Sequence, residues 1–475
     1  MFDVLIIGCG VVGAATAYAL SKYQVKIALI EKENDVALGA SRANSAIIHA
    51  GFDPEEGTLM AKLNVKGCRM AKDLCRKLSV PYRENGSLVL SFSPEEDRTI
   101  EKLCQRGLKN GVPDLRIVEK EELHQMEPAL SEGACRALYA PHSGIVSPWN
   151  YTLAMAEVAV KNGTELHLST RVTGLEKLSD SWMVHTDRGD FESRYVLNCA
   201  GVHSAEMHNL AAEPDFRIIP CRGQYYVLDK CEGALCTRTL FQCPSALGKG
   251  VLVSPTADGN LIVGPDAVNI EDSEDTSTTA EQLAFIRRAA EKTTDKINYR
   301  NSIRNFAGVR ANSDRKDFII SFAEKGFLDI AGIKSPGLTA APAIGEYAAE
   351  LLEKDGLNLT PKEHYDDRRK VVRFKELPPE EKNRLIRENP LYGRIICRCE
   401  TVTEGEIVDA IHSVIPATTV DGVKRRCSAG MGRCQGGFCG PRVHEILSRE
   451  LGVPLDAIEM DEEGSFILTT PTKEA

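Results

Sequence analysis

The sequence has 475 residues, more than one hydrophobic core usually supports, so we expect two or three domains. Its hydrophobic content of 43% and charged content of 27% are those of an ordinary globular protein, and its net charge of −10 argues against nucleic acid as a partner. No secretory signal precedes the first expected strand and no apolar run approaches the ~20 residues of a membrane span, so we expect a cytoplasmic protein without a membrane span.

The first thirty residues carry a dinucleotide-binding pattern. An apolar run leads into the turn GCGVVG, a helical pattern follows, and a second apolar run ends on Glu31. Gly8 permits the tight turn, Gly10 lets a pyrophosphate approach the backbone, and Gly13 lets the helix pack on the strand. The helix N-terminus favours the phosphates, and Glu31 is placed to bind the ribose. The alternative is a chance glycine turn.

A small, polar, glycine-flanked segment, residues 39–51, follows the acid. Its composition predicts a loop whose backbone lies close to something bulky. The loop directly follows the ribose-binding acid, so we expect it to run beneath the cofactor. The alternative is a surface loop with one incidental histidine, His49.

The rest of the first 355 residues alternates helical and strand patterns. Amphipathic helices are expected at 57–78, 94–110, 148–162 and 283–292, and a last helix runs to residue 352. Strands are expected at 165–168, 171–178, 182–186, 195–198, 216–228, 251–254, 261–263 and 327–331. The turn ADGN at 257–260 predicts a hairpin.

This order predicts an α/β protein in which a Rossmann-type nucleotide-binding domain is interleaved with a mixed-sheet substrate domain. We assign both to residues 1–358. Residues 359–392 are polar and charged and are expected to form a linker or a surface strap. A small metal-binding domain at 393–452 and a C-terminal tail at 453–475 complete the prediction.

The second chemical site is a set of cysteines beyond that linker. Fifteen cysteines in a cytosolic-looking protein suggest metal or redox chemistry rather than disulfides. Cys397 and Cys399 form one close pair, and Cys434 and Cys439 form another among several glycines. Four thiolates near backbone N–H donors suit a [2Fe–2S] cluster, whereas zinc sites usually have wider gaps than a single residue. A four-thiolate zinc site is the alternative, and we interpret Cys427 as a non-ligand neighbour.

The two sites together imply a flavin. An iron–sulfur cluster carries one electron at a time, whereas organic substrates usually lose two electrons as a hydride. A flavin converts between these modes and a nicotinamide does not. No second glycine fingerprint follows a strand, so the single dinucleotide is expected to be FAD.

Several motifs resemble the D-amino-acid-oxidase-like superfamily of FAD oxidoreductases over residues 1–355. They are GCGVVG with Glu31, ASRANSAIIHAG, LNCAG and GIKSPGLTAAPAIG. The loop motif and PCRGQYYVLD look like glycerol-3-phosphate dehydrogenases and L-2-hydroxyglutarate dehydrogenases, and PTADGNLIVGPDA looks more like the latter. The segment from CRCETVTEGEI to CQGGFC resembles the bacterioferritin-associated-ferredoxin-like [2Fe–2S] domain, which also ends the large subunit of the anaerobic glycerol-3-phosphate dehydrogenase.

The resemblance implies a set of FAD-binding residues. The three glycines and Glu31 hold the ADP half, and backbone at Val172 contacts the adenine. A helix N-terminus faces the flavin pyrimidine oxygens, where its dipole stabilises negative charge. The other implied residues are Ser41, Arg42, Asn44 and Ser45 beside the pyrophosphate and ribityl chain, Ala200 and Gly201 closing over the cofactor, and Gly337, Leu338 and Thr339 at that N-terminus.

The resemblance also implies catalytic residues. His49 matches a histidine beside the flavin ring, and a base with a pKa near 6–7 suits removal of a hydroxyl proton. Arg310 matches the arginine that binds the anionic group of the substrate. Lys334 stands near the lysine of the Gly-Gly-Lys-Leu-Thr motif common in glycerol-3-phosphate enzymes, although its neighbours differ. Alternatively, His49 is structural or covalently attached to the flavin, and Arg310 pairs with Asp314 or Asp317.

The leading functional hypothesis is an FAD and [2Fe–2S] dehydrogenase of a small anionic secondary alcohol, most simply glycerol 3-phosphate. The alternatives are an L-2-hydroxyglutarate or other 2-hydroxyacid dehydrogenase, an amine or imino-acid dehydrogenase subunit, and an electron-transfer subunit. Because the cluster needs an acceptor, we expect a partner protein, for which the resemblance suggests a flavoprotein subunit. An oxidase is the rival hypothesis, but it leaves the cluster without a purpose.

Overall fold

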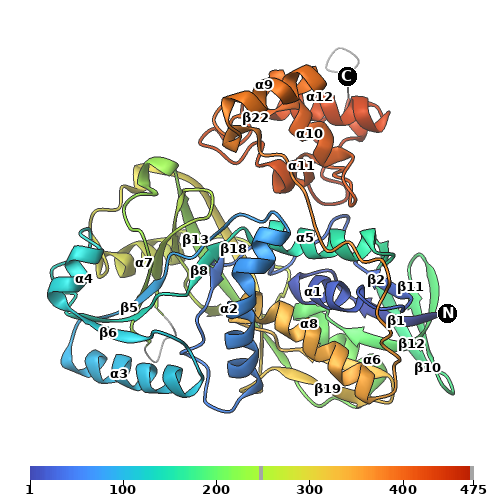
Figure 1. Ribbon diagram of the computed structural model, residues 1–475, viewed down its shortest axis with the longest axis horizontal. Coiled ribbons are helices and arrows are strands. Elements are labelled where there is room, and N and C mark those ends of the chain that lie inside the picture. The colour runs from blue at the N-terminus through green and yellow to red at the C-terminus, as the bar shows by residue number, and fades with distance from the viewer. Residues whose placement is uncertain (245–249, 471–475) are drawn as a thin grey trace. The chain divides into compact units, whose positions relative to one another are not determined.

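The computed structural model describes residues 1–244 and 250–470, and its contacts divide the chain into two compact units. Unit 1 comprises Met1–Lys32 and Val36–Arg368, and unit 2 comprises Glu33–Asp35 and the chain from Arg369 onward (Figure 1). The division after Arg368 falls inside the polar stretch 359–392. Residues before it pack on unit 1, where Gln24 donates its backbone N–H to the Thr360 carbonyl (2.8 Å).

The first sheet of unit 1 is mainly parallel and carries the N-terminal strand at its centre. Its strands are β1 (Phe2–Ile7), β2 (Ile27–Ile30), β9 (Glu165–His167), β10 (Val172–Lys177), β11 (Trp182–Thr186), β12 (Gly189–Asn198), β19 (Ile319–Glu324) and β20 (Phe327–Ala331). β1 pairs in parallel with β2 on one side and with β12 on the other. The carboxyl ends of these strands therefore meet at one edge, where ligands of open α/β sheets bind.

Four helices build the layer beside this sheet: α1 (Val11–Leu20), α2 (Leu59–Lys77), α5 (Pro148–Lys161) and α8 (Gly337–Lys354) (Figure 1). Their crossings need glycine. A Cβ on Gly345 of α8 would lie 2.4 Å from the Ala15 carbonyl oxygen in α1, and a Cβ on Gly67 of α2 would lie 2.0 Å from the Thr339 carbonyl oxygen in α8. Close packing through these glycines fixes the N-terminal end of α8 against the rest of the unit.

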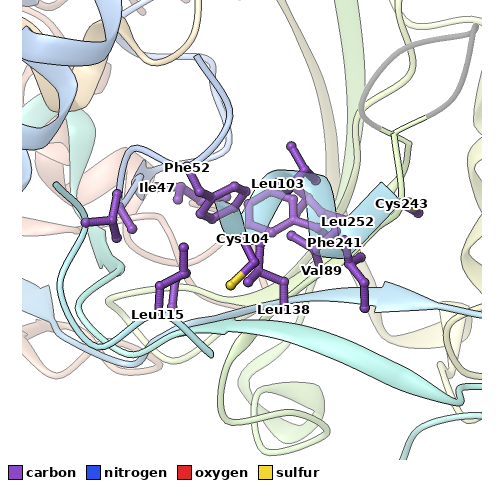
Figure 2. Close-up of a cluster of buried hydrophobic side chains, with 14 of the residues drawn as sticks. Ile47, Phe52, Val89, Leu103, Cys104, Leu115, Leu138, Phe241, Cys243 and Leu252 are labelled. Carbon is purple, nitrogen blue, oxygen red and sulfur yellow. The ribbon is translucent and has the colours of Figure 1, made fainter. Parts of the chain in front are cut away.

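The second sheet of unit 1 is mixed. Its strands are β5 (Ser87–Ser91), β6 (Arg116–Glu119), β7 (Arg136–Ala140), β13 (Ile218–Leu228), β14 (Thr239–Gln242), β15 (Leu252–Pro255), β16 (Leu261–Gly264), β17 (Val268–Asn269) and β18 (Ser302–Ser313). The helices α3 (Pro94–Lys109), α4 (Lys120–Met126) and α7 (Ala280–Glu291) pack against its strands. A buried cluster that includes Phe52, Leu103, Leu138 and Phe241 joins α3 to this sheet (Figure 2).

A short antiparallel ribbon forms a separate small sheet of unit 1. It consists of β3 (Ile47–Ile48), β4 (Tyr82–Arg83) and β8 (Gly144–Val146). Ile47 also belongs to the cluster beneath the second sheet (Figure 2). The ribbon therefore anchors the segment 39–51 at the two residues directly before His49. A further helix, α6 (Ser204–Ala211), follows the turn after β12.

Unit 2 is a small helical domain with its own core. Its elements are α9 (Pro379–Glu388), β21 (Ile395–Cys397), β22 (Val402–Thr403), α10 (Glu404–Ile411), α11 (Val420–Cys427) and α12 (Gly440–Leu451). α10 begins with a capping box, in which the Thr403 hydroxyl accepts from the Glu406 N–H and the Glu406 carboxylate accepts from the Thr403 N–H. Buried Asp35, the last residue of the short segment in this unit, accepts from Arg425 and Arg426.

The expected elements of residues 1–355 are largely confirmed, including the hairpin between β15 and β16. The helix expected at 283–292 instead begins at Ala280, because the Thr279 hydroxyl caps the Gln282 N–H. The long strand β18 was not expected, and neither was α9 inside the polar stretch. Among the described residues, no helix is long and apolar enough to cross a membrane.

Candidate active site and candidate metal centre

The glycine turn after β1 has the geometry predicted for it. Gly8 has a φ of +97°, and a Cβ there would lie 2.7 Å from the Cys199 carbonyl oxygen. A Cβ on Gly13 would lie 1.9 Å from the Gly8 carbonyl oxygen, so only glycine lets α1 start this close to the turn. The Glu31 carboxylate accepts from the Cys9 N–H at 2.7 Å, which holds the acid against the turn.

The N-terminus of α1 is suited to an anion. Its first turn contains no acidic residue, and Gly10 gives it no side-chain cap. By contrast, α2, α3 and α7 each begin with a Ser or Thr hydroxyl that accepts an N–H of the first turn. The Ser41 hydroxyl accepts from the Val11 N–H (2.8 Å), which brings the following loop to this helix end. The other backbone N–H groups of this first turn, together with the helix dipole, suit a pyrophosphate.

The remaining residues expected around the dinucleotide lie on the same sheet edge or in the loop. The turn at Ala200 and Gly201 follows β12 and lies against Gly8, because a Cβ on Gly8 would be 3.3 Å from the Ala200 Cα. Val172 is buried at the start of β10. The Asn44 amide donates to the Ala40 and Ser41 carbonyls, so this side chain shapes the loop itself, and Arg42 follows Ser41 within it.

The N-terminus of α8, like that of α1, has no side-chain cap. It starts at Gly337 and has no acidic residue in its first turn. The Thr339 hydroxyl does not point away from the protein, because it accepts from the His49 N–H (2.9 Å) and donates to the Ile47 carbonyl (3.3 Å). It therefore fixes the loop of residues 39–51, here called the histidine loop, to the helix. The helix end, with Leu338, keeps backbone donors suited to negative charge.

His49 lies between elements that are far apart in the sequence. Its Nε2 atom is 3.4 Å from the Ser335 hydroxyl oxygen, and its ring stacks on Phe241 of β14 at 5.8 Å between centroids. The Asn64 amide holds the His49 carbonyl at 2.9 Å. Phe241 and Ser335 thus contact the imidazole, and the second of these has no signal in the sequence, while Asn64 fixes the backbone of His49.

Arg310 is half-buried on β18 and faces strand β13. Its guanidinium donates to the Cys221 sulfur (3.5 Å) and to the Asp266 carbonyl (3.2 Å). Within the described residues it forms no ion pair with a carboxylate. Asp317 instead accepts from the first N–H groups of α2, and Asp314 accepts from the Arg217 N–H. The hydrogen bonds of the guanidinium go to neutral groups, and the nearby Asp266 carboxylate interacts with it through its charge.

Asp266 supports this arrangement through its side chain. Its buried carboxylate accepts from the Gln224 N–H at 2.6 Å, and burial raises its pKa. Its own carbonyl is the acceptor for Arg310. Next to this contact, a Cβ on Gly223 would lie 2.1 Å from an Arg310 nitrogen, so glycine here leaves room for the guanidinium in its present position.

The histidine loop also contacts the strands that carry Arg310. The Ser45 hydroxyl is 3.1 Å from the Tyr225 hydroxyl of β13, and Tyr225 stacks on Phe306 of β18 at 4.6 Å between centroids. A Cβ on Gly308 of β18 would lie 1.9 Å from the Ala43 carbonyl oxygen. The loop is therefore packed between α8 and the second sheet, and this packing brings the His49 and Arg310 segments into one region.

Lys334 takes a different position from its neighbour Ser335. Its ammonium group donates to the Arg315 carbonyl at 3.3 Å, whereas the Ser335 hydroxyl reaches the His49 ring. Its predicted catalytic role stays a prediction.

The four predicted cysteine ligands are brought together in unit 2. The sulfur atoms of Cys397 and Cys399 are 3.8 Å apart, and those of Cys399 and Cys434 are also 3.8 Å apart. The Cys439 thiol donates to Cys397 and, with backbone N–H groups, lowers the pKa of Cys397 to about 5. By contrast, the Cys427 thiol donates to the Val423 carbonyl of its own helix.

The four cysteines suit a [2Fe–2S] cluster in number and in their proximity. A [2Fe–2S] cluster divides its four thiolates between two irons, which matches a chain of sulfur contacts. A Cβ on Gly432 would lie 2.5 Å from the Cys399 sulfur, so the backbone approaches this centre closely.

Comparison with known proteins identifies both units. Residues 3–351 match the model of the FAD dependent oxidoreductase family, and residues 395–449 match that of the BFD-like [2Fe-2S] binding domain. The chain belongs to the FAD-dependent oxidoreductase family. The expected α/β fold and the expected FAD and [2Fe–2S] cofactors are confirmed by these matches.

Three proteins show where this chain lies within the family. A glycerol 3-phosphate dehydrogenase of Caloramator mitchellensis is 50% identical over 476 residues, covering 100% of this chain and 99% of that protein. A mitochondrial L-2-hydroxyglutarate dehydrogenase of Caenorhabditis elegans is 34% identical over 281 residues, covering 56% of this chain and 64% of that protein. The structure of dithionite-reduced L-alpha-glycerophosphate oxidase from Mycoplasma pneumoniae with FAD bound has a TM-score of 0.74 at 32% identity, covering 78% and 99% of the two chains.

Proposed function

We propose that this FAD-dependent oxidoreductase dehydrogenates glycerol 3-phosphate and passes the electrons through its [2Fe–2S] cluster to a partner protein. The observation that supports this most strongly is the 50% identity to a glycerol 3-phosphate dehydrogenase over both units of the chain. Identity that extends through the BFD-like domain supports a shared electron path as well as a shared substrate.

The Arg310 guanidinium is proposed to bind the substrate phosphate. It is half-buried, its hydrogen bonds are to a thiol and a carbonyl, and no ion pair joins it to a carboxylate among the described residues. A partly desolvated guanidinium whose hydrogen bonds go to neutral acceptors gains from a bidentate, charge-assisted contact with an anion. Such a contact fixes the substrate carbon relative to the flavin.

His49 is proposed to take the proton from the substrate hydroxyl. Its Nε2 atom lies at the Ser335 hydroxyl, which we propose as a second contact for the substrate oxygen. When bound, FAD accepts the hydride from the carbon that carries this hydroxyl. The Thr339 and Asn64 contacts hold the backbone of His49 in place while its imidazole takes the proton.

Cys397, Cys399, Cys434 and Cys439 are proposed as the cluster ligands. The chain contains a one-electron carrier in addition to the flavin that accepts the hydride. We therefore expect the final electron acceptor to be a protein rather than oxygen. The reduced enzyme should therefore react slowly with oxygen and rapidly with an artificial dye. A cytoplasmic location is part of the proposal, since all fifteen cysteines are free thiols in the structure.

L-2-hydroxyglutarate is the second candidate substrate. It is favoured by the 34% identity to an L-2-hydroxyglutarate dehydrogenase and by a guanidinium that suits a carboxylate as well as a phosphate. The identity to that protein covers 56% of the chain, which is why we place this substrate second.

Anaerobic bleaching of the flavin tests the proposal. The purified enzyme would be mixed with glycerol 3-phosphate, L-2-hydroxyglutarate, other 2-hydroxyacids and amino acids, and its absorbance followed in a stopped-flow instrument. Glycerol 3-phosphate is expected to bleach the flavin fastest. If a hydroxyacid or an amine bleaches it faster, the substrate assignment is wrong, and if none does, the chain relays electrons only.

A further inference from the structure

An exposed aromatic side chain stands beside the cysteine centre. Phe438 is 85% exposed, whereas its sequence neighbour Cys439 is 2% exposed. The backbone N–H of Phe438 donates to the Cys434 sulfur and lowers the pKa of that thiol. Phe438 therefore belongs to the loop of residues 434–439, here called the ligand loop. An apolar ring this exposed gains nothing from the fold and is available to a partner, and aromatic side chains are enriched among the residues that dominate protein interfaces.

The charged side chains in and beside the cysteine loops are unevenly exposed. Arg394 and Arg442 have 63% and 67% of their side chains exposed, and Arg398 is exposed between two of the cysteines. Arg394 pairs with Glu404, of which 1% is exposed, and Glu400 is 3% exposed. Arg442 pairs with Glu445, which is itself 54% exposed. Three exposed arginines and one exposed acid, Glu445, therefore flank the cysteines of a chain whose net charge is −10, which leaves an excess of exposed basic groups there.

We propose that Arg394, Arg398, Phe438 and Arg442, here called the cluster face, dock a small acidic electron-carrier protein. This inference rests on the proposed electron transfer out of the cluster. Guanidinium groups steer and orient an acidic partner, and Phe438 supplies the buried apolar contact that such interfaces need at their centre. A partner seated on Phe438 also lies directly over the ligand loop, which shortens the path of the electron.

Compensation of the cluster's negative charge is an alternative role for the arginines, and it predicts different binding results. Thiolate-ligated clusters are anionic, so basic side chains nearby also offset that charge and raise the reduction potential. That role does not require Phe438, which carries no charge. The aromatic residue and the salt dependence of binding therefore separate docking from charge compensation.

The experiment uses the holoenzyme and oxidised flavodoxin, a small acidic electron carrier, as the probe. Binding would be measured by calorimetry between low and physiological salt for the wild type, for Phe438→Ala and for Arg398→Glu with Arg442→Glu. Each variant should weaken binding about tenfold or more, and the double charge variant should also lose most of the salt dependence. Basic cytochrome c should bind the wild type poorly and the double charge variant better.

Matched controls come from the same unit. Phe466→Ala removes a ring that is 50% exposed outside the ligand loop, and Arg384→Glu reverses a side chain that is 67% exposed on α9. Neither should change flavodoxin binding. Iron content and the electron paramagnetic resonance spectrum of the reduced cluster should be those of the wild type in every variant.

Three outcomes would overturn the docking surface. They are unchanged binding in Phe438→Ala, equal losses in the controls, or a shifted cluster potential with unchanged flavodoxin affinity in the charge variant. Substrate-driven flavin bleaching is recorded in parallel. Its absence would refute the proposed function, whereas normal bleaching with unaltered flavodoxin binding would refute only the cluster face.

Discussion

The two units assemble their reactive groups in opposite ways. In unit 1, His49, Ser335 and Arg310 come from a loop, a helix end and a strand, and the His49–Ser335 contact spans 286 positions of the sequence. In unit 2, the four cysteines lie in one stretch from Cys397 to Cys439, and two short loops suffice to gather them. The first site depends on the packing of a whole domain, whereas the second depends on a few thiolates and on the metal that they bind.

This difference predicts how each site fails. A cluster that lacks one of its four ligands cannot assemble, so the loss of bound cluster should be close to complete. A substrate site held by many independent contacts should lose activity in steps, each set by the contact removed.

The largest effect is expected from Cys434→Ser or Cys439→Ser. Loss of one thiolate should abolish the cluster, because both irons need two protein ligands each. Iron, acid-labile sulfide and the absorbance of the cluster would be measured together with FAD content. FAD and substrate-driven flavin reduction should stay at wild-type levels, because they reside in unit 1.

Cys427→Ser is the control for that experiment, since its thiol donates to the Val423 carbonyl. Retention of the cluster in Cys427→Ser is the expected result. A protein that contains zinc and neither iron nor sulfide would refute the assignment of the metal centre.

The second effect concerns the proposed base. His49→Ala should slow flavin reduction by about 10²–10⁴-fold, the usual contribution of a positioned general base, with little loss of FAD. Stopped-flow reduction at saturating substrate measures it. His142→Ala, which removes an exposed histidine of the same unit, should react at the normal rate. If His49→Ala also does so, His49 is not the base.

The third effect concerns the anion site. Arg310→Ala should lower kcat/KM by about 2–4 kcal/mol, mainly through KM, because a charge-assisted pair with the substrate is lost. Arg304→Ala, at an exposed position of the same strand, is the matched control. An unchanged kcat/KM in Arg310→Ala would show that the guanidinium is structural.

The smallest effect should come from the residue that supports Arg310. Asp266→Ala removes the acceptor of the Gln224 N–H and releases the carbonyl that holds the guanidinium, so KM should rise by the equivalent of about 1 kcal/mol. Asp266→Asn keeps an oxygen at this position and should restore most of the affinity. Equal losses in both variants would show that the charge of Asp266, not the contact, matters.

The sequence was sufficient for features that are local. The glycine turn, Glu31 and the paired cysteines are short patterns whose geometry follows from a few neighbouring residues, and β1, α1 and β2 follow from apolar periodicity. The BFD-like domain and the FAD-binding domain were therefore predictable from residues and resemblance.

Other features have no local signal. β18 was missed because Arg304, Asn305 and Gly308 interrupt an apolar alternation, although pairing with β13 determines the strand. Ser335 looks like an ordinary turn residue before Pro336, and only the packing of α8 against the histidine loop reveals its contact. The Asp266 contact with Arg310 likewise depends on a loop and a strand that meet only after folding.

The central claim is that a hydride site and a one-electron site work in series within this chain. An anaerobic titration with glycerol 3-phosphate tests it most directly, with flavin absorbance and the electron paramagnetic resonance signal of the cluster recorded on the same sample. The account predicts that the flavin bleaches and that the signal of the reduced cluster appears with it, without any added protein. A bleached flavin beside a cluster that stays oxidised throughout the titration would contradict it.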